Sequence, residues 1–288
     1  MASERDIKRR IKAVRNVQQI TKAMKMVAAA RIKKAEDKLK AARPYSRKLQ
    51  EVMRELISQM DEVVHPLMEV RQVKRTGMLI VTSDKGLCGA YNNNLFKLAW
   101  QFMEKTGHSN LSNVVVGGKG EKFFRRRKVE MGMLRAGVNP SFELAQEIAN
   151  QLTDWYLSGQ VDRVVVFYTQ AVSAAVQRPA QEQLLPLVHE VKADELQGAS
   201  LVYEFEPSAE EALNILLPRY LSNTIYRILV EARVSELGAR LKSMTNATDN
   251  ADKLAHSLTL QFFRIRQENI TKEILEIVGG AEALAASS

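Results

Sequence analysis

The N-terminal end of the chain carries apolar side chains at the spacing of a long amphipathic helix. No glycine occurs before Gly77 and the first proline is Pro44, so no strong helix breaker precedes that proline. Ser3 with Asp6 forms an N-cap and an acidic first turn, which predicts a helix from about Ser3 to Leu56. Its apolar positions recur mostly at steps of three and four: Ile7, Ile11, Val14, Val17, Ile20, Met24, Val27, Ala35 and Leu39.

The C-terminal third shows the same kind of pattern. A short β-type run at residues 201–205 ends before Ser208, where a second helix is predicted to start with two glutamates in its first turn. Only Pro218 and Gly238 interrupt this helix before Gly279. Its apolar positions are Leu213, Leu217, Tyr220, Ile228, Leu241, Met244, Leu254, Leu258, Phe262, Ile265, Leu275 and Val278. Two rods of this length cover their apolar stripes best by pairing as an antiparallel coiled coil.

Between the two rods the pattern alternates between strands and helices. Short β-type runs occupy residues 78–83, 113–118 and 161–170, and an additional edge strand is predicted within residues 173–187. Helices are predicted to begin near Ala90 and to run from an Asn139–Pro140 cap through Tyr156. Alternation of this kind is typical of an α/β unit with a largely parallel sheet.

The predicted fold class is therefore α/β plus a long antiparallel coiled coil, with a Rossmann-like α/β domain inserted between the two helices. The predicted divisions are an N-terminal coiled-coil helix at 1–60, a central α/β domain at 70–207 and a C-terminal coiled-coil helix at 208–288.

The composition agrees with this predicted fold and argues against disulfide-bonded, membrane-spanning and secreted proteins. The 288 residues are 45% hydrophobic and 26% charged, an ordinary globular balance. The single cysteine, Cys88, cannot form an internal disulfide, so a reducing compartment is expected. No apolar run reaches the ~18 to 20 residues that span a bilayer, and the N-terminus lacks the apolar core of a secretory signal. A soluble, cytoplasmic protein is the expectation.

Charge adds an asymmetry. Residues 1–50 hold 16 basic and 4 acidic side chains, a net +12, whereas the other 238 residues hold 26 basic and 29 acidic ones, a net −3. The positive field therefore belongs to the N-terminal helix, and an acidic partner is expected to face it. Nucleic acid, an anionic membrane surface and an acidic protein all satisfy that requirement electrostatically.

The order of basic and apolar residues in this helix argues against two of these partners, nucleic acid and a membrane surface. Basic and apolar residues share the same turns, whereas a DNA-binding basic region precedes its zipper, and residues 1–44 contain no aromatic side chain for stacking bases. The apolar face consists of Ile, Val, Met and Ala, without the bulky Trp, Phe or Leu of a membrane-surface helix. The remaining interpretations are a solvated coiled-coil face and a shaft inside an acidic protein sleeve.

No set of residues forms a catalytic pattern. The turn at 117–123 has Phe123 where a dinucleotide fingerprint needs its third glycine, and the turn at 83–89 lacks Walker A spacing. Both are interpreted as tight strand-to-helix turns. The four histidines offer Cys88 no recognisable base, so this cysteine is interpreted as a buried small hydrophobe.

Four blocks of sequence, in this order, resemble the gamma subunits of rotary F-type ATP synthases. They are Ile20–Ala35 (ITKAMKMVAAARIKKA), Ser83–Phe96 (SDKGLCGAYNNNLF), Met244–Ala251 (MTNATDNA) and Ile270–Ala283 (ITKEILEIVGGAEA). In the last block, the residues at the family's pattern positions are Thr271, Glu273, Glu276, Gly280 and Ala281. The resemblance extends over nearly the whole chain.

The resemblance implies a central rotor shaft without a catalytic site, which couples rotation of the c-subunit ring to conformational change at the catalytic sites of the beta subunits. The implied partners are the hexamer of alpha and beta subunits, the epsilon subunit and the c ring, with no nucleic acid and with contact to the membrane only through the complex. The implied location is peripheral, on the cytoplasmic face of the bacterial plasma membrane. No cofactor or metal is expected on this chain, since ATP, ADP and Mg²⁺ bind to the partner subunits in this family.

The resemblance also implies two groups of contact residues. The rotor–stator contacts are Lys22, Met24, Lys25, Arg266, Gln267, Thr271 and Glu273. An apolar bearing tip is formed by Ile274, Ile277, Val278, Ala281 and Leu284. Two alternatives from other classes remain: a basic coiled coil that binds nucleic acid, and a small enzyme built on residues 70–207.

Overall fold

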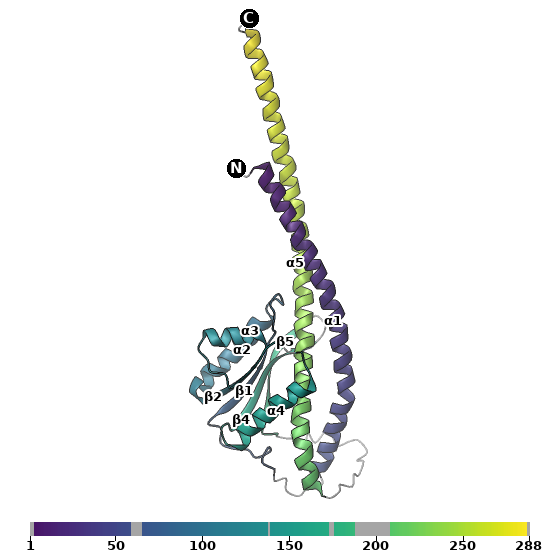
Figure 1. The fold of residues 1–288 in the computed structure, drawn as a ribbon, viewed down its shortest axis with the longest axis vertical. Helices are drawn as coiled ribbons and strands as arrows, with labels where there is room; N and C mark the ends of the chain where they lie inside the picture. Colours follow the sequence, from purple (N-terminus) through teal and green to yellow (C-terminus); the bar gives the residue numbers. More distant parts are fainter. Residues whose placement is uncertain (1–2, 59–64, 138, 173–175, 188–207, 287–288) are drawn as a thin grey trace. The chain divides into compact units, whose positions relative to one another are not determined.

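The structure is a computed structural model that describes residues 3–58, 65–137, 139–172, 176–187 and 208–286. The β-type run expected at residues 201–205 lies outside this range. The chain divides into two compact units, Met1–Val27 with Leu241–Ser288, and Ala28–Arg240. Two long helices, α1 (Glu4–Ser58) and α5 (Ala209–Ala286), each contribute to both units (Figure 1).

Both long helices start where their caps predict. The Ser3 hydroxyl accepts a hydrogen bond from the Asp6 amide at 3.2 Å and donates one to the Asp6 carboxylate at 2.9 Å, which lowers the pKa of Asp6. Ser208 accepts from the Glu211 amide at 3.2 Å in the same way. Pro44 lies within α1 without ending it, and Pro218 lies within α5.

Most of the buried side chains of α1 belong to one heptad position, seven residues apart or at multiples of seven: Ile7, Thr21, Ala28, Ala35, Leu49 and Leu56. Met53, 2% exposed, lies at a second buried position, four residues after Leu49 and three before Leu56. Val17, Ile20 and Val27 of the predicted stripe are instead 51–60% exposed. The apolar positions in the sequence therefore do not coincide with the positions that face α5. A coiled coil buries positions at a period of 3.5 residues, and small or polar side chains occupy several of them in α1.

Within the first unit, α1 and α5 pair in antiparallel fashion. Gln18 donates a hydrogen bond to Asp252 at 2.9 Å, and Thr248 donates one to Thr21 at 2.9 Å. The contact position therefore advances three residues along α1, from Gln18 to Thr21, while it goes back four residues along α5, from Asp252 to Thr248. The buried positions on α5 also alternate by fours and threes, and Met244, Ala251 and Ala255 are 3–8% exposed. The predicted seam residue Leu254 is 50% exposed, because Ala255 takes the place facing α1.

Within the second unit, the same two helices pair again and also cover the sheet. Asn223 of α5 donates a hydrogen bond to Ser46 of α1 at 2.8 Å, and Ala35 clusters with Val234 and Leu237. The larger core joins α1, α4, α5 and one face of the sheet, with Leu56 and Leu221 fully buried.

The sheet has five strands in the order β3-β2-β1-β4-β5. The strands are β1 (Thr76–Val81), β2 (Leu111–Val116), β3 (Met133–Arg135), β4 (Arg163–Ala171) and β5 (Gln177–Leu185). The strands β1 to β4 are parallel to one another, and β5 pairs antiparallel with β4 at the edge. This order places β1 at the centre: the chain passes from β1 through β2 to β3 at one edge, and then crosses back to β4 on the other side of β1.

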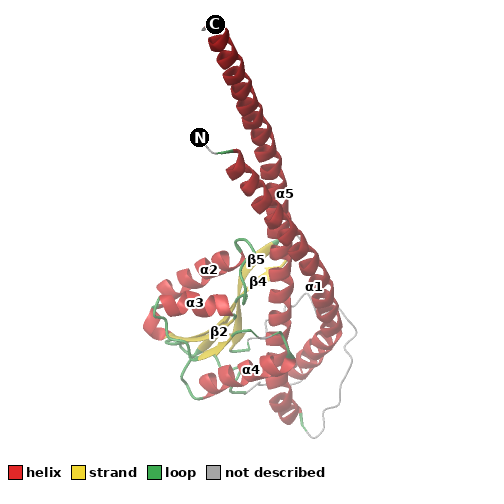
Figure 2. Ribbon diagram, turned by 45° about the horizontal axis from the view of Figure 1, so that its top comes forward, coloured by secondary structure: helices red, strands yellow, loops and turns green. Residues whose placement is uncertain are grey.

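Helices cover both faces of this sheet. The connecting elements are α2 (Tyr91–Thr106), a 3₁₀ turn η1 (His108–Asn110), α3 (Gly118–Arg126) and α4 (Phe142–Leu157). Met78 and Ile80 of β1 pack toward α2 and α3, whereas Leu79 and Val81 pack toward α4 and α5. Figure 2 shows the strands between these two helical layers.

The sequence predicted this arrangement and missed three local features. The edge strand and the α/β domain between two helices are confirmed. The basic run after β2 is the helix α3, and β3 is too short, at three residues, to leave a pattern. The cap of α4 is Ser141, which accepts from the Leu144 amide at 3.2 Å, instead of the predicted Asn139–Pro140.

The observed helix register predicts a specific disulfide. Val14 and Ala255 lie at matching seam positions, one heptad from the Thr21–Thr248 contact. In a Cys88→Ala background, Val14→Cys/Ala255→Cys should therefore form an internal disulfide under mild oxidation, detected by mass spectrometry of the digested chain. Val14→Cys/Ser257→Cys is the matched control, because Ser257 is exposed on another side of α5. Equal crosslinking of the two pairs would contradict the register.

Two glycines with positive φ should respond differently to alanine. At Gly117 (φ +103°) an added Cβ would lie 2.3 Å from the Thr82 carbonyl oxygen, whereas at Gly137 (φ +74°) it would meet nothing within 4 Å. Gly137→Ala should cost about 1 kcal/mol of unfolding free energy from backbone strain, and Gly117→Ala about 2–4 kcal/mol because overpacking adds to that strain. Urea denaturation of the full chain measures both, and equal losses would contradict the predicted clash.

Candidate functional site

The loop after β1 is held by backbone amides of the turns that follow β2 and β3. Asp84 Oδ1 accepts hydrogen bonds from the backbone amides of Gly118 at 3.0 Å and Gly137 at 2.7 Å. The Thr82 hydroxyl accepts from the Gly120 amide at 2.9 Å, and the Ser83 carbonyl accepts from the Lys119 amide at 2.9 Å. The first three amides of α3 are thus all bonded to the β1 loop.

This arrangement explains why the turn at 117–123 is not a phosphate loop. A phosphate site at a helix N-terminus needs free backbone amides directed at the ligand. Here protein oxygens already occupy those amides. These bonds confirm the interpretation of the turn at 117–123 as a tight structural connection, and the same interpretation of the turn at 83–89 stays a prediction.

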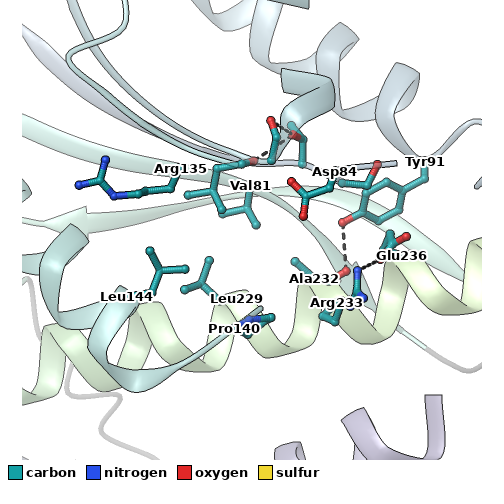
Figure 3. A pocket seen from close by; sticks show the side chains of 14 residues that line it. Val81, Asp84, Tyr91, Arg135, Pro140, Leu144, Leu229, Ala232, Arg233 and Glu236 are labelled. Carbon is teal, nitrogen blue, oxygen red and sulfur yellow. Dashed lines mark hydrogen bonds and ion pairs between the residues drawn. The ribbon is translucent and has the colours of Figure 1, made fainter. Parts of the chain in front are cut away.

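A small cavity lies beneath the β1 loop, against α5 (Figure 3). Its volume is about 40 Å³, room for one or two water molecules and too little for a substrate. The Tyr91 hydroxyl at its edge donates a hydrogen bond to the Ala232 carbonyl of α5 at 3.0 Å. Burial and then the nearby Glu236 carboxylate raise the pKa of Tyr91, so the phenol stays protonated and remains a donor.

A buried ionic cluster on α5 lies beside this cavity. Glu236, 2% exposed, pairs with Arg233 at 2.6 Å and with Arg240 at 2.5 Å. Arg240 also donates to the carbonyls of Lys85 and Gly86, both at 3.1 Å, and so joins α5 to the β1 loop. This cluster was not predicted from the sequence, although charged residues three and four apart in an apolar helix were the available signal.

A second polar network connects α5 to the edge of the sheet. Arg227 lies 3.3 Å from Glu182 of β5 and 3.1 Å from Glu231 of its own helix. Glu231 accepts from the Ala171 amide at 3.3 Å, and Tyr168 donates to Glu182. Arg227 and Glu182 are about one third exposed and Glu231 is buried. A partly buried network of this kind favours one arrangement of the packed elements, because a shifted helix would leave charges unpaired.

Cys88 is 2% exposed, as the sequence predicted for a small buried side chain. Its Sγ accepts a hydrogen bond from Asn92 Nδ2 at 3.3 Å. Among the described residues no histidine is bonded to it, so the structure offers this thiol no base for nucleophilic chemistry.

The predicted rotor–stator residues all belong to the first unit but form two separate groups. Arg266, Gln267, Thr271 and Glu273 are exposed on α5. Lys22 is exposed on α1, and Met24 and Lys25 are half-buried there. The pairing of Gln18 with Asp252 places Met24 opposite about residue 246 of α5, so roughly 30 Å of helix separates the two groups.

The predicted tip residues lie where α5 is a single helix. The same register places Glu4, the first residue of α1, opposite about Arg266, and α5 continues to Ala286. Ile274, Ile277 and Val278 are 55%, 71% and 48% exposed. Ala281 is exposed as well, and Leu284 lies within α5.

No helix in the described part of the chain is both long and apolar enough to cross a bilayer. Nor does that part of the chain gather three or more His, Cys, Asp or Glu side chains into a group that could hold a metal ion.

Similarity to known proteins extends over the whole chain. A family profile described as ATP synthase matches residues 3–284. The chain is 48% identical over 286 residues to the ATP synthase gamma chain of Desulfitobacterium hafniense, covering 99% of this chain and 100% of that relative. It is 45% identical over 291 residues to the ATP synthase gamma chain of Heliobacterium modesticaldum, again covering 99% and 100%.

Two solved structures share the fold. A chain of the Euglena gracilis mitochondrial ATP synthase, in a structure of OSCP/F1/c-ring in rotational state 3, superposes with a TM-score of 0.68 at 18% identity, covering 99% of this chain and 95% of that chain. A chain from the central stalk/c-ring of the Tetrahymena thermophila mitochondrial ATP synthase gives a TM-score of 0.59 at 24% identity, covering 79% and 99%. With the profile match and the identities above, these similarities lead to one assignment: the chain belongs to the ATP synthase gamma chain family.

Proposed function

We propose that this chain is the central rotor shaft of a bacterial proton-translocating F-type ATP synthase. It couples rotation of the c ring to conformational change in the catalytic beta subunits. The observation that carries this proposal is the shape of the first unit: α1 and α5 pair as a rod, and α5 extends about 20 residues further as a single helix with an exposed apolar face. A rod that ends in uncovered apolar side chains suits insertion into a protein sleeve.

The proposed partners are the alpha and beta subunits, the epsilon subunit and the c ring. The names of similar solved chains, which mention F1, the central stalk and the c ring, support assembly into such a complex. The chain itself performs no chemistry in this proposal, since ATP, ADP and Mg²⁺ bind to the partner subunits. It is held at the cytoplasmic face of the membrane only through the complex.

The shaft acts on its partners by contacting each of them differently at each angle. A partner that has two conformations is shifted only by contacts whose free energy differs between them. The exposed polar side chains of Arg266, Gln267, Thr271 and Glu273 can form and break charge-assisted hydrogen bonds as the shaft turns. Lys22 and Lys25, with Met24, provide a second, basic contact for acidic loops on the stator.

The single-helix end of α5 acts as a bearing in this proposal. Apolar contacts have no preferred direction, so their energy changes little with rotation, whereas hydrogen bonds and ion pairs depend on angle. Ile274, Ile277, Val278, Ala281 and Leu284 bring such contacts to the tip.

Replacing the polar contact residues tests the torque-bearing role. Arg266→Leu or Gln267→Leu should lower ATP-driven proton pumping and ATP synthesis on the order of tenfold, because charge-assisted contacts are lost. Assembly should be unaffected, since both side chains are exposed in the free chain. Arg264→Leu and Gln261→Leu are matched controls on the same helix. Unchanged turnover in a fully assembled Arg266→Leu complex would remove these residues from the proposed contact.

Deleting residues 279–288 tests the bearing. The thermal midpoint of the assembled complex should fall, because apolar burial in the sleeve is lost, while proton pumping per ATP hydrolysed should change little. Differential scanning calorimetry beside a pumping assay measures both quantities. Loss of pumping with an unchanged thermal midpoint would show that the tip transmits torque.

A further inference from the structure

The second unit contains a larger, strongly basic cavity that the rotor function does not use. Its volume is about 530 Å³, within the usual range of small-molecule sites. It opens between α1, α5, the loop after β1 and the loop before α4. Its basic side chains are Arg31, Lys34, Lys38, Lys85, Arg233 and Arg240.

Acidic side chains balance only part of this charge. Among the described residues that line the cavity, Asp84 is the only carboxylate, and its Oδ1 already accepts hydrogen bonds from two backbone amides. Glu236 pairs with Arg233 and Arg240. Among the described residues, the four other cations have no ion pair. Like charges gathered around one cavity repel one another, so an anion bound there would lower the energy of the folded chain.

One guanidinium in the lining of the cavity is held in place by several partners. Arg240 is 9% exposed, and its Nη2 is fixed by the carbonyls of Lys85 and Gly86 and by Glu236. Its buried Nε has no hydrogen-bond partner among the described residues. A fixed guanidinium loses little entropy when a ligand binds beside it.

The position in the sheet also favours a ligand. The cavity lies beyond the carboxyl end of β1, the central strand, whose neighbours β2 and β4 are reached by connections toward opposite edges. In open α/β sheets, ligands bind in the crevice at such a switch point. The α3 amides cannot serve as donors here, because Thr82, Ser83 and Asp84 occupy them, so side chains must provide the contacts.

We propose that this cavity binds a small anion of the pyrophosphate class, either inorganic pyrophosphate or the diphosphate group of a nucleotide. Lys34 and Lys38 lie one turn apart on α1 and face the anion from one wall, and Arg233 and Arg240 face it from the other. The site is independent of the contacts proposed for the rotor, because all its residues lie within the second unit.

Calorimetric titration of the full chain with pyrophosphate, at a fixed ionic strength of about 0.15 M, is the first test. One site should saturate, and sulfate at equal ionic strength should bind more weakly. Lys34→Gln/Lys38→Gln should raise the dissociation constant about tenfold or more. Lys33→Gln/Lys97→Gln removes the same charge from exposed positions outside the cavity and should leave the constant within about threefold. Equal weakening by both pairs, or no saturable binding, overturns the proposal.

Comparing the affinities of inorganic pyrophosphate and ADP distinguishes the free anion from the diphosphate group of a nucleotide. If the cavity recognises the diphosphate group alone, both should compete at the same site with similar affinity. Tighter binding of ADP assigns the ligand to a nucleotide, and tighter binding of pyrophosphate assigns it to the free anion. If pyrophosphate and ADP do not displace each other, they do not share one site, and the proposal is wrong.

A footprinting experiment on the assembled complex distinguishes a small anion from an acidic protein segment. Lys34 and Lys38 should react with an acetylating reagent in the absence of pyrophosphate and become protected when it is added, with Lys33 reactive throughout. This readout is specific to these lysines and is not disturbed by nucleotide sites on other subunits. If Lys34 and Lys38 are unreactive before any anion is added, a protein segment covers the cavity and the proposal is wrong.

Discussion

Burial of the central part of α5 is the interaction on which the rest of the structure depends. Between Leu213 and Leu237 this helix covers one face of the sheet and packs against α1, so a single helix completes two interfaces. Leu221, Ile225 and Ile228 are fully buried there, each worth roughly 1.5–3 kcal/mol of transfer free energy. Apolar burial alone would allow α5 to slide or rotate. The polar contacts of Tyr91 with Ala232, of Arg240 with the β1 loop and of Arg227 with Glu182 allow one position only.

Most of the fold was predictable from sequence because its elements are long and strongly patterned. Helices without glycine and strands of consecutive Val and Ile give clear signals. The seam of α1 could not be read in the same way, because Thr21, Ala28 and Ala35 occupy buried positions while Val17, Ile20 and Val27 are exposed. Close helix packing favours small side chains at the contact, and hydrophobicity does not measure size. The short β3 and the basic helix α3 were missed because each depends on packing against the sheet instead of on its own pattern.

The functional residues are harder to predict than the fold, and the reason is physical. A catalytic centre gathers perturbed acids, bases or metal ligands in a cleft, and each of these leaves a recognisable trace. A surface that transmits force by contact needs exposed side chains of suitable chemistry at the correct angle and height. In the free chain, Arg266 and Gln267 differ from other exposed polar residues of α5 only in position. Resemblance to a family can suggest them, whereas burial and electrostatics of the chain alone cannot. The turn at 117–123 is the opposite case, since the missing third glycine already argued against a phosphate loop in the sequence, and the protein partners of the α3 amides agree.

Stability of the second unit and occupancy of its basic cavity are necessarily linked. The cavity walls are α1, α5 and the β1 loop, the same elements that the buried ionic cluster joins. An anion bound between Lys34 and Lys38 on one side and Arg240 on the other contacts the paired arrangement of the helices and has no equivalent site when they separate. By mass action, binding of such an anion stabilises the paired state of the helices. Any change that loosens the helix pairing lowers the affinity for the anion by the same coupling free energy. Charge that destabilises the empty unit therefore becomes a source of rigidity once an anion is bound.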